Sequence, residues 1–407
     1  MKVDRFIGSK LKAEENAKGS TIGIISVALS IAVIIIAVTV VAGFRREIKT
    51  KASGFMGELA LVQPGQSVMN DKYPFTDSIS YLEELGSQPY VDKIQPVAYT
   101  AGLLKTEENI YAVYLKGIDS LYDGSFFQSV LVEGEMPVYS GRISNDVVIS
   151  TTMADVMGYE LGSSITAYFI SDEVKVRRFN VCGIYDAQLE NIDKTLLLAD
   201  IRHVQRINGW NPDEVSAIEV SLRDGVPIDA GFRAVEEFVF EHGSEADPGL
   251  FTTSIKRIFP NLFDWLTLLD MNVVIVLILM VIVAGFNMIS TLLIILFEKI
   301  STIGLLKALG MDNKGVGDIF KYVSLNIVGK GLIIGNVFAL ALCLIQKYFK
   351  VITLNPDNYF VKYVPIDINF VYILLADILS LFVIMTILRV TSVFIAKVSP
   401  DKTMRAA

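Results

Sequence analysis

The amino-acid sequence predicts four transmembrane helices in a 1+3 arrangement, with a large α+β extracytoplasmic domain inserted between the first helix and the second. Two patterns lead to this fold class. Four apolar runs are each long enough to cross a bilayer, which takes roughly 20 residues. Between the first two runs, residues 45–265 contain segments that alternate as strands do, separated by stretches with helical spacing.

The distribution of charge supports the same division of the chain. Its 407 residues are 52% hydrophobic and 20% charged, and the mean hydropathy is +0.49. From Arg45 to Asp264, 19 Lys and Arg stand against 33 Asp and Glu, a net charge of −14, whereas the rest of the chain carries +6. An acidic block between basic, apolar ends is typical of a water-exposed domain joined to a membrane part.

The predicted spans follow the apolar runs. We place them at residues 21–44, 271–297, 322–349 and 368–396. The first run is longer than the 7–15 apolar residues of a signal peptide, and no convincing cleavage site follows it, so we predict a retained anchor. Residues 1–20 are amphipathic and predict a cytoplasmic, interfacial helix, with a frayed cytoplasmic tail as the alternative.

Loop charge sets the expected orientation of the spans. Lysine and arginine are concentrated in residues 1–20, in the segment 298–316 after the second span, and in the tail 397–407. These parts are therefore predicted to be cytoplasmic, with the domain 45–265 and the loop 350–367 on the outer side. A basic cluster directly after the first span argues the other way, so the charge rule favours this topology without fixing it.

Several segments of the domain have the spacing of a regular element. Alternation predicts strands over 110–118, 163–170, 174–184 and 216–222. Helical spacing predicts helices over 77–87, 153–162 and 229–243. Together these segments indicate a mixed α+β domain.

The sequence carries no recognisable catalytic machinery. It has no G-x-x-x-x-G-K-[ST] phosphate loop, no G-x-S-x-G nucleophile elbow and no H-E-x-x-H zinc motif. The two histidines and two cysteines are scattered, so neither a zinc site nor a disulfide is expected. We predict a membrane protein that is not an enzyme, binds no nucleic acid, and has no metal or cofactor of its own.

Two charged residues fall inside predicted spans, where charge is costly and usually faces a protein partner. Lys330 and Asp377 each lie roughly 12–15 Å into the membrane, at 1.5 Å per helical residue. We hypothesise that they form an intramembrane ion pair between the third and fourth spans. The alternatives are that each snorkels or pairs elsewhere, or that they belong to a proton relay.

The third span also contains a G-x-x-x-G pair, Gly331 and Gly335, which lets two helices approach closely. Packing within one subunit and a contact between two subunits are both compatible with this spacing.

The whole pattern resembles the type VII ABC transporter permeases, and most closely the lipoprotein-releasing permeases of the LolC/LolE family. The most specific match is VAGFNMISTLLIILFEKISTIGLLKALG at residues 283–310, and DVVISTTMADVMGYELGSSI and FNVCGIYDAQLENID resemble runs in the outer domain of that family. The chain departs from the family at Ser150, where glycine is usual, and at Ser324 and Val328, where the third span has lost glycines.

The resemblance implies a non-catalytic permease that forms a dimer with itself or with a paralogue. A separate ATPase subunit would bind ATP and Mg²⁺. The complex would extract lipoproteins from the bacterial inner membrane and pass them to a periplasmic carrier, with the large domain in the periplasm. The expected lipid site is a hydrophobic cavity between the first and second spans of the two subunits.

The same resemblance assigns the segment 298–316 to ATPase coupling, as a short helix that lies in a groove of the ATPase. The residues predicted to make this contact are Glu298, Lys299, Ile303, Gly304, Leu306, Lys307, Leu309 and Gly310. A short amphipathic connector resting on lipid headgroups is the alternative.

Other functions share parts of this architecture. Macrolide-type efflux pumps usually carry an ATPase on the same chain, and division permeases of the FtsX type have a much smaller outer domain. A mechanotransmitting efflux permease for another substrate and a signalling permease that regulates a periplasmic enzyme stay open as alternatives.

Overall fold

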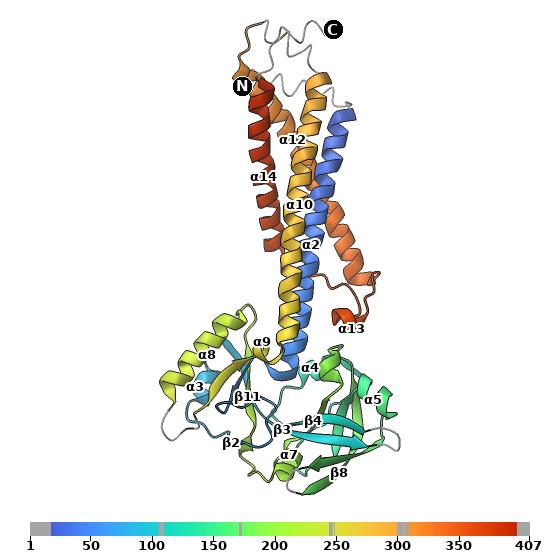
Figure 1. The fold of residues 1–407 in the computed structure, drawn as a ribbon, viewed down its shortest axis with the longest axis vertical. Coiled ribbons are helices and arrows are strands. Elements are labelled where there is room, and N and C mark those ends of the chain that lie inside the picture. Colours follow the sequence, from blue (N-terminus) through green and yellow to red (C-terminus); the bar gives the residue numbers. More distant parts are fainter. Residues whose placement is uncertain are drawn as a thin grey trace. The chain divides into compact units, whose positions relative to one another are not determined.

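The computed structural model describes residues 18–105, 110–170, 173–243, 247, 249–298, 305 and 309–396. The chain forms two compact units (Figure 1). The helical unit comprises Met1–Arg46, Trp265–Thr353 and Tyr363–Ala407. The inserted domain comprises Glu47–Asp264 together with Leu354–Lys362.

Long helices carry all four predicted spans. They are α2 (Lys18–Met56), α10 (Pro260–Glu298), α12 (Asn313–Phe349) and α14 (Phe370–Ala396). Within the described residues, three stretches are long and apolar enough to cross a membrane: Thr21–Met56, Pro260–Asn287 and Tyr322–Phe349. The described apolar stretch of α14, Phe370–Val383, is shorter, so the fourth crossing stays a prediction. The interfacial helix predicted within residues 1–20 lies almost wholly outside the described residues.

The core of the helical unit lies between α2, α12 and α14. Val27, Ile31 and Ile35 of α2 are buried in one cluster with Ile327 and Val328 of α12. Ile373 of α14 joins the same cluster. Val328 therefore serves as a core residue of this unit.

Two arginines of the basic cluster after the first span pair with carboxylates of the helical unit. Arg45 forms an ion pair with Asp270 of α10, and Arg46 Nη1 lies 3.2 Å from Asp367 Oδ1. These pairs leave the number of basic residues after the first span unchanged, so the orientation of the spans stays a prediction.

The inserted domain is built on a ten-stranded mixed sheet in the order β12-β1-β11-β3-β4-β9-β6-β8-β5, with β7 paired to β3 and β8. Its strands are β1 (Leu59–Val62), β3 (Val91–Lys105), β4 (Ile110–Ile118), β5 (Leu131–Gly134), β6 (Asp146–Ser150), β7 (Ser164–Ile170), β8 (Val174–Tyr185), β9 (Leu196–Asp200), β11 (Ala217–Leu222) and β12 (Phe251–Ser254). A two-stranded sheet pairs β2 (Phe75–Thr76) with β10 (Glu214–Val215).

Short helices pack around this sheet. They are α3 (Leu82–Gly86), α4 (Ser125–Ser129), α5 (Thr151–Met157), α6 (Glu190–Asp193), α7 (Ile201–Asn208), α8 (Ile228–His242) and α9 (Ile255–Ile258). One core cluster joins α5 and α7 to β3, β4, β6, β7, β8 and β9. In α5, Ser150 is the N-cap, and its Oγ accepts a hydrogen bond from Met153 N, so this serine caps the start of the helix.

All four predicted strands are confirmed, with β4 matching its predicted bounds. The helix predicted over 77–87 is wrong for its first half, because only Leu82–Gly86 is helical. Ser80 Oγ there donates to Asp247 Oδ2 at 2.7 Å, and such side-chain bonds compete with helix formation.

The connection between α12 and α14 belongs partly to the inserted domain. Residues Leu354–Lys362, which include α13 (Pro356–Tyr359), cluster with the inserted domain rather than with the helices on either side. The sequence alone predicted only a loop at 350–367.

Candidate functional site: the end of helix α2 within the inserted domain

The last turns of α2 are embedded in the inserted domain. Ile48, Ala52 and Phe55 are fully buried. The Phe55 ring packs edge-on against Phe127 and Tyr185, with ring centroids 5.6 Å and 6.0 Å apart. A helix of 39 residues is about 58 Å long at 1.5 Å per residue, so α2 reaches well beyond a bilayer core of about 30 Å.

A buried ammonium holds the C-terminal end of α2. Lys116 of β4 donates to the backbone oxygen of Phe55 at 2.6 Å. The last carbonyls of a helix have no partner within the helix and carry partial negative charge, so a cation placed there stabilises the helix end.

The same ammonium is paired with a buried carboxylate. Lys116 Nζ lies 2.8 Å from Glu219 Oε1 of β11, and both side chains are at most 2% exposed. Tyr99 donates its hydroxyl to Glu219 at 3.0 Å, and Lys116 donates to the Tyr122 hydroxyl at 2.9 Å. The network of Lys116, Glu219, Tyr99, Tyr122 and the Phe55 carbonyl is called the α2 anchor below.

Burial and pairing oppose each other in the α2 anchor. Burial lowers the pKa of Lys116 and raises the pKa of Glu219, while the charge of each partner counteracts the shift of the other. Burial also raises the pKa of Tyr99 and of Tyr122 well above the usual value, so both hydroxyls stay neutral hydrogen-bonding groups.

A second contact attaches the segment 354–362 close to the same helix end. Lys51 of α2 donates to Gln188 Oε1 at 2.9 Å and to the Phe360 carbonyl at 3.1 Å. Lys362 Nζ lies 2.6 Å from Asp186 Oδ2. Gln188 and Phe360 both have positive φ, near +60°, which is costly for residues other than glycine. We call Lys51, Asp186, Gln188, Phe360 and Lys362 the loop clamp.

A buried carboxyl group lies close to the loop clamp. Asp193 is 2% exposed, and its Oδ2 accepts a hydrogen bond from Leu189 N at 3.0 Å. Among the described residues, its Oδ1 has no hydrogen-bond partner. Burial raises the pKa of Asp193 to about 7, although the Lys51 charge acts in the opposite direction.

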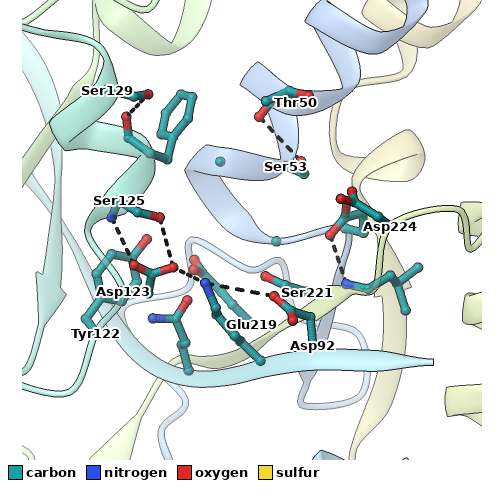
Figure 2. Close-up of a pocket in the computed structure, with 17 residues that line it drawn as sticks. Thr50, Ser53, Asp92, Tyr122, Asp123, Ser125, Ser129, Glu219, Ser221 and Asp224 are labelled. Atoms are coloured by element: carbon teal, nitrogen blue, oxygen red, sulfur yellow. Dashed lines mark hydrogen bonds and ion pairs between the residues drawn. The ribbon is translucent and has the colours of Figure 1, made fainter. Parts of the chain in front are cut away.

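A polar cavity of about 410 Å³ lies beside the α2 anchor (Figure 2). Thr50 and Ser53 of α2 line it together with Asp92, Asp123 and Glu219. Asp123 forms an ion pair with Lys93, and its carboxylate accepts a hydrogen bond from Ser125 Oγ at 2.9 Å. No group of three potential metal ligands occurs within the part of the chain that the structure describes.

The predicted ATPase-coupling residues are only partly described. Lys299, Ile303, Gly304, Leu306 and Lys307 lie outside the described residues. Glu298 is the last residue of α10.

The end of the predicted coupling segment is described. Leu309 N donates to Leu305 O at 3.0 Å, as in a helical turn, and Gly310 has a φ of +94°. Leu305 and Leu309 are 62% and 77% exposed. Asp312 caps α12, which begins at Asn313, inside the segment predicted as 298–316.

The structure gives Asp377 a partner that the sequence did not indicate. Asn336 of α12 donates to Asp377 Oδ1 of α14 at 3.1 Å. The ion pair between Asp377 and Lys330 stays a prediction.

The two glycines of the G-x-x-x-G pair face α2. A Cβ on Gly331 would lie 2.8 Å from Val27 Cβ, and one on Gly335 would lie 2.6 Å from the Ala28 carbonyl oxygen. Both glycines therefore permit close packing of α12 on α2 within this subunit.

The α2 anchor was not identified from the sequence. Its signal is present, since Lys116 interrupts AVYLKGI and Glu219 interrupts AIEVSL, two strands that are otherwise apolar at inward positions. Opposite charges on buried strands can be recognised as a pair only when the two strands are known to share a sheet.

Comparison with known proteins covers nearly the whole chain. Residues 20–238 match the MacB-like periplasmic core domain, and residues 274–400 match the FtsX-like permease C-terminal family. The chain is 22% identical over 383 residues to the lipoprotein-releasing system transmembrane protein LolC of Xylella fastidiosa, covering 89% of this chain and 87% of the relative. It is 24% identical over 386 residues to LolE of Haemophilus influenzae, covering 90% and 88%.

Among solved structures, the periplasmic region of MacB from Actinobacillus actinomycetemcomitans is 16% identical, with a TM-score of 0.34 over 51% of this chain and 93% of that chain. Independently of that structure, the two family models account for both the inserted domain and the helices that follow it. The chain belongs to the permeases with a MacB-like periplasmic core domain and an FtsX-like C-terminal domain, and it is a LolC/LolE-like type VII ABC permease.

Proposed function

We propose that this chain is the transmembrane subunit of an ABC transporter that extracts lipoproteins from the bacterial inner membrane for transfer to a periplasmic carrier. The proposal rests on its LolC and LolE relatives, whose names assign them to a lipoprotein-releasing system, and on the match along most of the chain. The inserted domain is then periplasmic, and the permease acts as a dimer with a second copy or a paralogue.

ATP hydrolysis is needed because moving the acyl chains of a lipoprotein out of the membrane has a large unfavourable free energy. Burial stabilises an acyl chain by about 0.8 kcal/mol per CH₂, so removing three long chains costs on the order of tens of kcal/mol. This chain binds no nucleotide in the proposal. A separate ATPase subunit hydrolyses ATP and presses on the segment 298–316.

The observation that carries the mechanism is the double attachment of the inserted domain. The α2 anchor fixes the end of α2 through Lys116, and the loop clamp fixes the connection between α12 and α14 through Phe360 and Lys362. A displacement of α2, or of α12 relative to α14, is thereby passed to the β-sheet rather than lost in a flexible linker.

The α2 anchor is suited to transmit force. Lys116 comes from β4 and Glu219 from β11, and β3 lies between these strands in the sheet. A force that displaces the end of α2 is therefore transmitted from the Phe55 carbonyl to Lys116 and Glu219, and so to the neighbouring strands β4, β3 and β11. In the proposal, this rigid joint lets ATP hydrolysis on one side of the membrane move the domain on the other.

The test is release of a triacylated lipoprotein from proteoliposomes that contain this permease, its ATPase subunit and a soluble periplasmic carrier. ATP-dependent transfer of the lipoprotein to the carrier is the expected result, with an unlipidated form of the same protein as the control. If the ATPase is active and the lipoprotein stays in the membrane, the proposal is wrong. A bound periplasmic hydrolase after copurification would then favour the signalling alternative.

A further inference from the structure

A second cavity of the inserted domain lies beside the edge of the sheet. Its volume is about 610 Å³, and it lies between the C-terminal half of α8 and the start of β12. Among the described strands, β12 pairs on one side only, with β1, so it is an edge strand. An edge strand offers unpaired backbone N–H and C=O groups to a further strand.

Two aromatic rings flank this cavity and are turned to solvent. Phe240 of α8 is 89% exposed and Phe251 of β12 is 61% exposed. Val239 and Leu250, which are both buried, form part of the apolar wall of the cavity. Exposed aromatic side chains that gather beside a cavity are typical of an interaction site.

Two buried hydroxyl groups in the cavity wall lack a partner. Tyr81 is 3% exposed and Thr252 is 7% exposed, and neither hydroxyl has a hydrogen-bond partner among the described residues. Burial, with a smaller contribution from the charge of Asp247, raises the pKa of Tyr81 to about 12, so its hydroxyl is a neutral donor. Leaving a buried polar group without a partner is unfavourable, and a ligand with backbone amide groups would supply the missing hydrogen bonds.

The charged residues of the cavity wall favour a positively charged ligand. Among the described residues that line the cavity, Glu236 and Glu237 of α8 stand against one cation, Arg233, whose Nε donates to the Asp229 carbonyl at 3.2 Å. Two carboxylates against one guanidinium make this described lining net negative, and Lys or Arg side chains complement it.

We propose that this groove binds an extended, basic-apolar segment of a partner protein, which adds a strand to β12. Its backbone pairs with the free edge of β12 and reaches Tyr81 and Thr252, an apolar side chain enters between Phe240 and Phe251, and a Lys or Arg faces Glu236 and Glu237. Pairing of this kind draws affinity from main-chain hydrogen bonds and specificity from alternate side chains. A lipid acyl chain fits less well, since it satisfies neither the two hydroxyls nor the negative charge.

The test selects peptides without assuming their sequence. Full-length permease in lipid nanodiscs is screened against a random library of 12-residue peptides on phage, and enriched sequences are synthesised. Enriched peptides should alternate apolar residues and carry Lys or Arg. Their affinity should fall at least tenfold for Phe240→Ser/Phe251→Ser and by a few-fold for Tyr81→Phe/Thr252→Val.

A matched control separates the groove from general surface hydrophobicity. Leu121→Ser/Val138→Ser removes two other exposed side chains of the same domain, 88% and 79% exposed, and should leave peptide affinity unchanged. On binding, the amides of Phe251–Ser254 should become protected from hydrogen exchange. N-methylation of alternate peptide residues should abolish both effects.

Three results would overturn the proposal. The first is a selection in which no enriched peptide depends on Phe240 and Phe251. The second is protection that appears elsewhere while β12 exchanges as before. The third is a different occupant: a fluorescent fatty acid that competes for the groove, or a dimer that dissociates in the Phe240→Ser/Phe251→Ser variant, would assign the groove to lipid or to a second copy.

Discussion

Lys116 Nζ lies 2.8 Å from Glu219 Oε1 in the interior of the inserted domain, and the same ammonium donates to the last turn of α2. One buried ion pair thus joins two strands of the sheet to a helix that begins in the predicted membrane-spanning part. A buried ion pair adds little to the free energy of unfolding, because two well-packed apolar residues of similar volume often stabilise a protein equally. Its position at a helix end favours a role in holding α2 in place.

Breaking this pair on one side should be costly. We expect Lys116→Met to destabilise the inserted domain by about 3–5 kcal/mol, since Glu219 is left buried without its counter-charge. The measurement is chemical unfolding of the full-length permease in detergent, followed by intrinsic fluorescence. Lys105→Met, on exposed Lys105 of β3, is the matched control and should change stability little. Equal stability of the two variants would contradict the account of the α2 anchor.

Removing both charges should restore much of that loss. In Lys116→Met/Glu219→Leu no charge is buried, so we expect a stability closer to that of the wild type than of Lys116→Met. The Phe55 carbonyl then loses its cationic cap, and exchange of the amides in the last turn of α2 should accelerate. An unchanged exchange rate there would mean that Lys116 does not hold the helix end.

The carboxyl group of Asp193 should make stability depend on pH. Its folded-state pKa, about 7, lies above the ordinary value of 3.8, so the protonated form is favoured in the fold. The protonated Asp193 therefore contributes fully to the free energy of unfolding below about pH 4. This contribution declines by about 1.4 kcal/mol per pH unit between the two pKa values and is absent above about pH 7.

Unfolding measured from pH 5 to pH 8 checks this behaviour. The stability of the wild type relative to Asp193→Asn should fall with pH and level off near pH 7. Asp155→Asn, at an exposed position of α5, should follow the wild type throughout. Parallel curves for wild type and Asp193→Asn would show that Asp193 is not the titrating group.

The loop clamp should order the segment 354–362. Lys51→Met removes two hydrogen bonds, to Gln188 Oε1 and to the Phe360 carbonyl, so the amides of this segment should exchange faster. Lys256→Met, which breaks an exposed ion pair with Asp229 in the same domain, provides the comparison. Faster exchange in both variants, or in neither, would argue against a specific role for Lys51.

The contact between α12 and α2 allows a test with two glycines of one helix. Gly335→Leu places a side chain against the Ala28 backbone and should destabilise the helical unit by about 1–3 kcal/mol. At Gly329, by contrast, an added Cβ would have no atom within 4 Å outside the neighbouring turns of its own helix. Gly329→Leu should therefore leave thermal stability in detergent almost unchanged. If Gly335→Leu is equally mild, the close packing of the two helices is wrong.

The sequence predicts the elements that obey simple periodicity. β4 and β8 alternate strictly enough to be found within a residue or two of their ends, and the apolar runs locate the four long helices. Periodicity does not predict β3, because Pro96 interrupts the strand and Val97–Thr100 are all buried, so polar and apolar residues do not alternate there.

The candidate site depends on contacts that no local pattern contains. Lys116 and Glu219 are 103 residues apart and meet only because β3 joins their strands. The loop clamp likewise brings Phe360 to Lys51 across 309 residues. Asn336 is a polar residue in an apolar run, but its partner Asp377 is identified only once the helices are packed.

The α2 anchor as a force-transmitting joint is the central claim, and the ratio of lipoprotein released to ATP hydrolysed tests it most directly. The measurement compares wild type, Lys105→Met and Lys116→Met/Glu219→Leu in proteoliposomes with the ATPase subunit and the carrier. We predict that the complex with the double variant, folded as judged by its unfolding transition, still hydrolyses ATP on its ATPase subunit but releases at least tenfold less lipoprotein per ATP, while the complex with Lys105→Met behaves as wild type. Release at the wild-type ratio by the folded double variant would contradict the account.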